Sequence, residues 1–239
     1  MDDTNGQVVA GGNGQGNRLD QLYYPTDVLI DKETDSLIIS DRGNGRVVRW
    51  SRRNGTTQGE ILIDNIGCWG LAIDDQRYLY ISDTEKHEVR RYQIGDKTGT
   101  IVAGGNGKGA GLNQLNWPTY LFIDQQQTVY VSENNNHRVM KWNKGAKEGI
   151  VVAGGQGKGN ALTQLSNPNG LECLCFMGNA DEFTYTVDLT SNQATSTTPS
   201  DSSSLLLPLS IHDDSPLLDL SENTTIKRKR QDKHSYINE

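Results

Sequence analysis

The side chains with the most obvious chemistry sit at equivalent positions of an internal repeat. His87 and His137 occupy one such position, and Asp41, Asp83 and Glu133 occupy another. Zinc catalysis usually uses three protein ligands, and the repeated part of the chain offers only these two histidines. A carboxylate that recurs after every apolar run is typical of a turn former or of an arginine partner. We therefore predict no catalytic residue, no metal site and no cofactor.

Glycine-rich loops form a second candidate site. They cover residues 11–16, 104–109 and 154–159, and each contains Gly-x-Gly steps of the kind found in phosphate-binding loops. Dinucleotide-binding and P-loop motifs place a helix directly after the glycines. Here each loop continues into Leu-x-Gln-Leu and a proline, so we expect no nucleotide to bind.

Basic and imidazole side chains gather in the loops that the repeat would place on one face. The set is Arg18, Arg42, Lys86, His87, Lys108, His137 and Lys158. Polar loops free of core packing are common binding sites. We predict that this face binds an acidic peptide or a nucleic-acid backbone, and the alternative is a solvated face without a ligand.

The repeat itself is the main signal for the fold. Val8–Gly16 returns as Ile101–Gly109 and as Val151–Gly159, and a weaker copy begins at Glu60. Each unit carries four short runs rich in Val, Ile, Leu and aromatic residues, with Gly, Asn and Asp between them. Four strands in a unit of roughly 40–50 residues are typical of a β-propeller blade. We therefore predict an all-β fold of four-stranded antiparallel sheets.

These motifs resemble NHL repeats. Pro118–Asp124, Val129–Glu133 and Asn136–Val139 follow the family pattern, and the other two units keep parts of it. The resemblance implies an NHL-type β-propeller over residues 8–171, as an incomplete or small ring of three and a half repeats. Val8–Ala10 would be an extra leading strand. We expect a degenerate part-blade over 172–189, and over 190–239 a disordered tail rich in Ser, Thr and acidic residues that contains a basic cluster.

Charge and composition restrict the classes of partner that we expect this chain to bind. The chain of 239 residues has a net charge of −7, and residues 171–239 contribute −6 of it through 5 Lys/Arg and 11 Asp/Glu. The repeated part is therefore close to neutral, and we expect no DNA partner. No apolar run approaches the length of a membrane span, and the first residues do not resemble a secretory signal. We expect no membrane partner and favour a cytoplasmic location.

The function that these features favour is a non-catalytic scaffold that binds a protein or peptide partner through loops on one face. Two alternatives remain open. One is an RNA-binding NHL propeller. The other is a fragment of a propeller enzyme, of the lyase or lactonase type, or of a ubiquitin-ligase adaptor.

Overall fold

The computed structural model describes residues 6–53, 55–170, 172–174, 184–186 and 209–210. Three four-stranded antiparallel sheets follow one another along the chain as blades of a β-propeller, which confirms the predicted fold class. Blade 1 contains β1 (Pro25–Asp31), β2 (Ser36–Asp41), β3 (Arg46–Ser51) and β4 (Glu60–Asp64). Blade 2 contains β5 (Cys68–Ile73), β6 (Tyr78–Asp83), β7 (Glu88–Gln93) and β8 (Thr100–Gly104). Blade 3 contains β9 (Pro118–Ile123), β10 (Val129–Glu133), β11 (Arg138–Trp142) and β12 (Ile150–Gly154).

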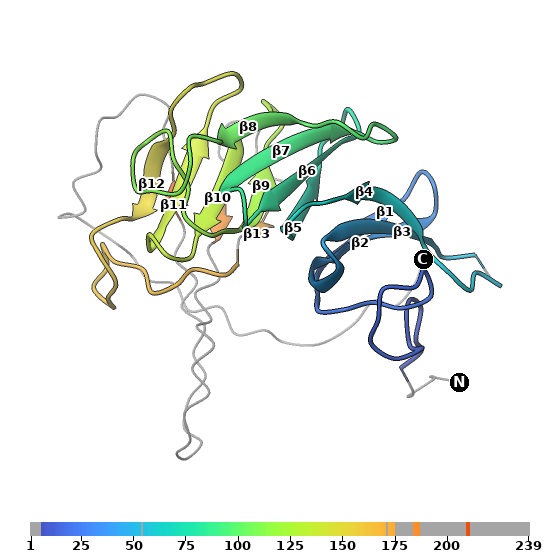
Figure 1. The fold of residues 1–239 in the computed structure, drawn as a ribbon. Helices are drawn as coiled ribbons and strands as arrows, with labels where there is room; N and C mark the ends of the chain where they lie inside the picture. The colour runs from blue at the N-terminus through green and yellow to red at the C-terminus, as the bar shows by residue number, and fades with distance from the viewer. Residues whose placement is uncertain (1–5, 54, 171, 175–183, 187–208, 211–239) are drawn as a thin grey trace, which may run out of the picture.

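The first strand of each blade faces its neighbours. The strand β5 contacts β1 and β2 of blade 1, and β9 contacts β5 and β6 of blade 2. Figure 1 shows the blades side by side in an arc from β1–β4 to β9–β12. The strands β1, β5 and β9 are therefore the inner strands. We call the end at which they begin the upper face, and the turns β2–β3, β6–β7 and β10–β11 lie at this same face.

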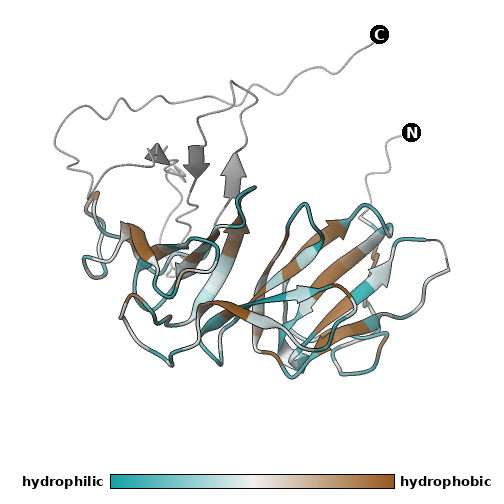
Figure 2. Ribbon diagram, turned by 90° about the horizontal axis from the view of Figure 1, so that it is seen from above, coloured by the Kyte–Doolittle hydropathy of each residue, from teal (hydrophilic) through white to brown (hydrophobic). Residues whose placement is uncertain are grey.

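The core consists of apolar layers between adjacent blades. Ile38 and Val47 of blade 1 pack against Leu71 and Ile81 of blade 2. Tyr80 of blade 2 packs in a second cluster with residues of blade 3, including Trp142. Middle strands are buried on both sides, which explains why they read as continuous apolar runs and not as alternating ones. Figure 2 shows this apolar colouring along the sheets and hydrophilic colouring along the loops.

Buried ion pairs hold the glycine-rich loops of blades 1 and 3. Arg46 binds the Asp41 carboxylate through Nε at 2.6 Å and donates to the carbonyl oxygens of Asn17, Arg18 and Gln21. In blade 3, Arg138 pairs with Glu133 in the same way and donates to three loop carbonyls. The predicted structural role of these repeated carboxylates is thus confirmed in both blades. Blade 2 has Glu88 at the arginine position and a shorter loop.

The expectation of a leading strand at Val8–Ala10 is wrong. These residues pair with no strand, and Val8 and Val9 are 77% and 64% exposed. The third strand of each described blade already pairs with the fourth strand of that blade, so Val8–Ala10 has no strand edge to join there. Ala10 instead packs with Leu22 against the outward face of blade 1.

A three-stranded sheet follows blade 3. It joins β13 (Glu172–Leu174), β14 (Thr184–Thr186) and β15 (Leu209–Ser210) in that order. Two of these strands lie in the segment predicted as a part-blade, and β15 lies in the segment predicted to be disordered. All other residues of 175–239 lie outside the described part, so the boundaries 172–189 and 190–239 stay predictions.

Candidate axial site

The most unusual side-chain arrangement at the upper face is an arginine between two tryptophans. Arg42 belongs to the short 3-10 helix η1 (Arg42–Asn44), and its guanidinium carbon lies 4.8 Å from the centre of the Trp69 ring and 5.6 Å from that of Trp117. Trp69 is the second residue of β5, and Trp117 directly precedes β9. Each blade thus contributes one residue to this cluster, which lies near the inner strands. Stacking on aromatic rings fixes the position of an arginine and leaves its N–H groups available for a ligand.

Two N–H donors in this cluster are not fully satisfied by the protein. Within the described residues, the buried Arg42 Nε has no hydrogen-bond partner, and the buried Trp69 Nε1 makes no hydrogen bond of standard geometry, although it interacts with the Tyr120 hydroxyl. None of the ion pairs formed within the described ranges includes Arg42. Both groups can donate but cannot accept, so they suit an oxygen that carries or develops negative charge.

A carboxyl group and a phenol of the inner strands belong to the same region, and Tyr120 interacts with both Trp69 and Asp27. Asp27 of β1 accepts hydrogen bonds from the Leu71 and Val28 amides, both at 2.8 Å, yet its burial raises the pKa of the carboxyl above the usual 3.8. Tyr120 of β9 donates from its hydroxyl to the Thr26 carbonyl at 3.1 Å. Burial and the nearby Asp27 charge raise the pKa of Tyr120, whereas hydrogen bonding by the Trp69 side chain lowers it.

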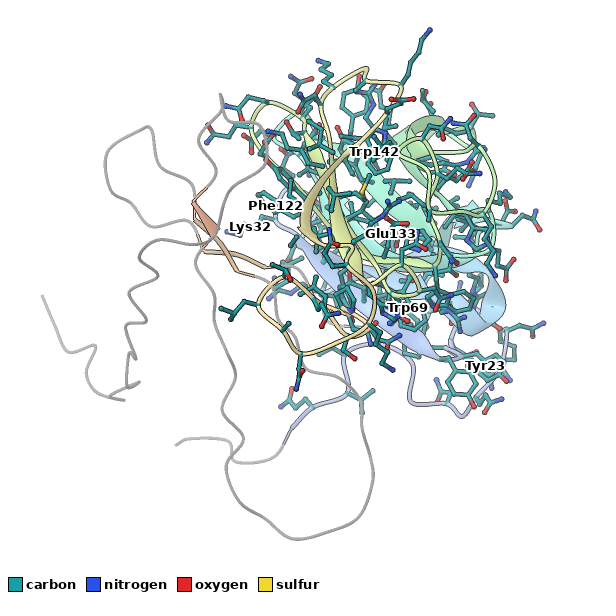
Figure 3. All side chains as sticks on the ribbon, turned by 90° about the vertical axis from the view of Figure 1, so that its left-hand side faces the viewer. Tyr23, Lys32, Trp69, Phe122, Glu133 and Trp142 are labelled. Carbon is teal, nitrogen blue, oxygen red and sulfur yellow. The ribbon has the colours of Figure 1, made fainter. Side chains whose placement is uncertain are left out.

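We name this group the axial site: Asp27, Arg42, Trp69, Trp117 and Tyr120. It combines two buried donors with a carboxyl that takes up a proton more readily than an exposed aspartate, because burial raises its pKa. Figure 3 shows Trp69 at the end of the molecule that also carries Tyr23, away from Trp142 near the opposite ends of the strands.

The two predicted histidines bind backbone amides, and His87 reaches the axial site through Trp117. The Nδ1 atom of His87 accepts the Trp117 amide at 3.2 Å, and that of His137 accepts the Asn167 amide at 3.2 Å. Burial lowers the pKa of each, and Lys108 and Lys158 respectively lower it further. Each neutral histidine therefore links its own blade to the segment that follows.

The other predicted residues are spread over the exposed loops. Lys108 and Lys158 are exposed near the two histidines, and Lys86 lies 3.8 Å from the Asp83 carboxylate. Arg18 is exposed and paired with Asp20 at 2.7 Å. Of the seven predicted residues, only Arg42 belongs to the axial site. The structure does not test whether the remaining six bind a ligand.

Sequence reasoning missed Asp27, Trp69, Trp117 and Tyr120. A usable signal exists in the repeat, because Asp27, Gly70 and Tyr120 occupy one aligned position in the three blades. A repeat position whose residue differs from blade to blade does not serve the packing that all blades share, so its side chains are candidates for a site. These four residues are not repeated between the blades, so a search for recurring residues does not find them.

Within the described residues, no group of three or more His, Cys, Asp or Glu side chains could hold a metal ion. No described helix is long and apolar enough to cross a membrane. Neither observation bears further on the reaction or on where the protein resides.

Comparison with known proteins shows the fold and little else. No family model matches the chain, and no curated protein matches it in sequence. Among solved structures, it is similar to a gluconolactonase from Xanthomonas campestris, with 17% identity and a TM-score of 0.53 over 71% of this chain and 60% of the other. A putative gluconolactonase matches with 12% identity and a TM-score of 0.52, over 75% and 61%. An auxiliary nutrient binding protein from Bacteroides thetaiotaomicron matches with 16% identity and a TM-score of 0.56, over 71% and 43%.

These neighbours correct the functional prediction. We expected a non-catalytic scaffold, and the neighbours include gluconolactonases, which favour the alternative of a propeller enzyme. The prediction failed because the sequence repeat defines only the blade framework, whereas chemistry resides in side chains grafted onto that framework. The chain spans about 60% of the length of the gluconolactonases that it matches.

Proposed function

We propose that this chain supplies three blades of a β-propeller enzyme that hydrolyses a small lactone at the axial site. The observation that carries the proposal is the pair of buried donors, Arg42 Nε and Trp69 Nε1, together with Tyr120, which interacts with both the Trp69 side chain and the Asp27 charge. The fold that the chain shares with gluconolactonases supports the choice of a lactone as substrate. The seven-residue binding face and a protein, peptide or RNA partner remain predictions.

The reaction assigns a role to each group. The two donors hold the lactone carbonyl oxygen and stabilise the negative charge that develops there when water attacks. Asp27 takes the proton of the attacking water, a bond forms between the water oxygen and the carbonyl carbon, and the ring C–O bond breaks. The proton then passes from Asp27 to the ring oxygen, which leaves as a hydroxyl. Trp117 holds Arg42 in place from the other side.

The repeat type is a separate part of the proposal. We infer that the blades are of the NHL type, since Pro118–Asp124 and Asn136–Val139 follow that pattern. The four-stranded blades support a propeller, and the assignment to NHL rests on these motifs.

Hydrolysis of glucono-δ-lactone by the full chain tests the function, with the spontaneous rate subtracted. We expect Asp27→Asn and Arg42→Met each to lower the rate by roughly 10²-fold or more, because each removes a group that acts in the transition state. Arg18→Met is the matched control, since Arg18 is an exposed arginine on the same face, and it should leave the rate unchanged. A chain without activity above background, or variants as active as the parent, would refute the proposal.

A further inference from the structure

A basic residue recurs on the third strand of every blade, and the residue that it faces on the fourth strand differs from blade to blade. Arg49 of blade 1 faces Glu60 across the β3–β4 pair and binds its carboxylate at 2.7 Å. Arg91 of blade 2 occupies the same position and faces Thr100 across the β7–β8 pair. The carboxylate that neutralises the arginine in blade 1 is therefore replaced by a hydroxyl in blade 2. No ion pair formed within the described ranges includes Arg91.

Aromatic side chains fix the position of Arg91. Its guanidinium carbon lies 4.6 Å from the centre of the Tyr78 ring. It also lies beside the Tyr80 hydroxyl, which donates to Asp74 Oδ2 at 2.9 Å. A cation held in this way is preorganised for an anion that the protein itself does not provide.

Gln127 provides a second unsatisfied group in the same region. Its Nε2 donates to Asp74 Oδ2 at 2.6 Å and to Gln76 Oε1 at 3.2 Å. These two acceptors fix the orientation of the amide, because a flipped amide would place its oxygen against a carboxylate. Its Oε1 is then a buried acceptor without a donor among the described residues, and the whole residue is 7% exposed.

Both groups line one groove between blades 2 and 3. The groove has a volume of about 640 Å³, and Val102, Val129 and Trp142 contribute its apolar lining. Lys144 and Lys147 of the β11–β12 loop also line the groove. Glu148 supplies the one carboxylate among its lining residues. The groove thus combines a net positive charge with one fixed acceptor and an apolar wall.

We propose that the groove between blades 2 and 3 binds a small hydroxycarboxylate, with its carboxylate on Arg91 and a hydroxyl donating to Gln127 Oε1. Arg91 and Gln127 are linked through Tyr80 and Asp74 and line the same groove, so one small ligand that carries both a carboxylate and a hydroxyl suits the two contacts. This site shares no residue with the axial site and does not depend on the proposed reaction.

Calorimetric titration of the full chain with D-gluconate tests this site. We expect saturable binding of gluconate, and binding at least tenfold weaker for hexanoate, which lacks the hydroxyls, and for D-glucose, which lacks the carboxylate. The three ligands need no variant, so this comparison holds even where a substitution prevents folding. Equal binding of gluconate and hexanoate would overturn the role of Gln127, and absence of gluconate binding would overturn the site.

Variants locate the binding in the groove. Arg91→Met should weaken gluconate binding by roughly tenfold or more, and Arg91→Lys should weaken it less because it keeps the charge. Arg49→Met, at the same position of blade 1, is the matched control and should leave it unchanged. Loss of binding in Arg42→Met with full binding in Arg91→Met would place gluconate at the axial site and refute this inference.

Discussion

Gly70 of β5 lies directly against the backbone of Tyr120 of β9. A Cβ atom at position 70 would stand 2.6 Å from the Thr119 carbonyl oxygen and 2.9 Å from Tyr120 Cα. Asp27, Gly70 and Tyr120 share one repeat position, so the missing side chain in blade 2 lets Tyr120 reach from blade 3 to Thr26 of blade 1. The axial site exists because one of the three inner strands carries no side chain there.

Gly70→Ala should therefore destabilise the fold by roughly 1–3 kcal/mol, because the added methyl meets backbone atoms that cannot move aside. Urea unfolding of the full chain measures this change. Gly6→Ala is the control, since no atom lies within 4 Å of its added Cβ. A stability loss equal in both variants would contradict the close packing of β5 on β9.

Arg77 joins blade 2 to blade 1 at the lower face, and its removal should be costly. Its Nη2 donates to Asp31 Oδ2 at 2.9 Å, and the Asp31 side chain is 1% exposed. We expect Arg77→Met to destabilise the fold by about 1.5–3 kcal/mol, because it leaves a buried carboxylate without its main partner. Arg52→Met removes an exposed pair with Asp35 and should change stability by about 0.5 kcal/mol or less.

The same pair predicts an acid dependence. The Arg77 hydrogen bond holds the pKa of Asp31 below its usual 3.8. The stabilisation is therefore complete above about pH 4 and is lost as the pH falls further, since the unfolded chain then binds a proton that the folded chain resists. Urea titrations at pH 5 and pH 3 should show a larger drop for the parent than for Arg77→Met. Equal drops would mean that Asp31 is not held by Arg77.

The two histidine links predict a second pH window. Burial lowers the pKa of His87 and His137 below the usual 6.5, and each neutral ring accepts a backbone amide. Their contribution is complete above about pH 6.5 and declines as the pH falls towards the lower folded pKa, because the unfolded chain takes up protons first. The double variant His87→Gln and His137→Gln should flatten stability between pH 7.5 and 5.5. A slope equal to that of the parent would exclude the histidines as its cause.

Trp69→Phe tests the role of the indole N–H separately from that of the aromatic ring. The phenyl ring still stacks on Arg42, but the Nε1 donor is gone, so we expect nearly unchanged stability and roughly 10²-fold slower lactone hydrolysis. Trp117→Phe is the matched control, because its indole nitrogen is not one of the two buried donors of the axial site, and its rate should stay within a few-fold of the parent. If both variants lose activity equally, the Trp69 donor has no special role.

The sequence alone determined the blades, because their packing repeats. Apolar runs such as Leu37–Ile39 must be buried on both sides, and the turn residues between them recur at fixed spacing, so the four-stranded unit follows from local pattern. The pairing of Asp41 with Arg46 and of Glu133 with Arg138 was equally readable, since each pair lies across a single strand turn.

Only the tertiary structure brought together the residues of the axial site, and likewise those of the groove. Arg42, Trp69 and Trp117 come from three different blades, and their contact depends on how adjacent sheets pack. Which donors and acceptors remain unpaired is also invisible in the sequence, because it depends on all the neighbours of each atom at once. Arg49 and Arg91 look alike in the sequence, and only the strand register shows that one faces Glu60 and the other Thr100.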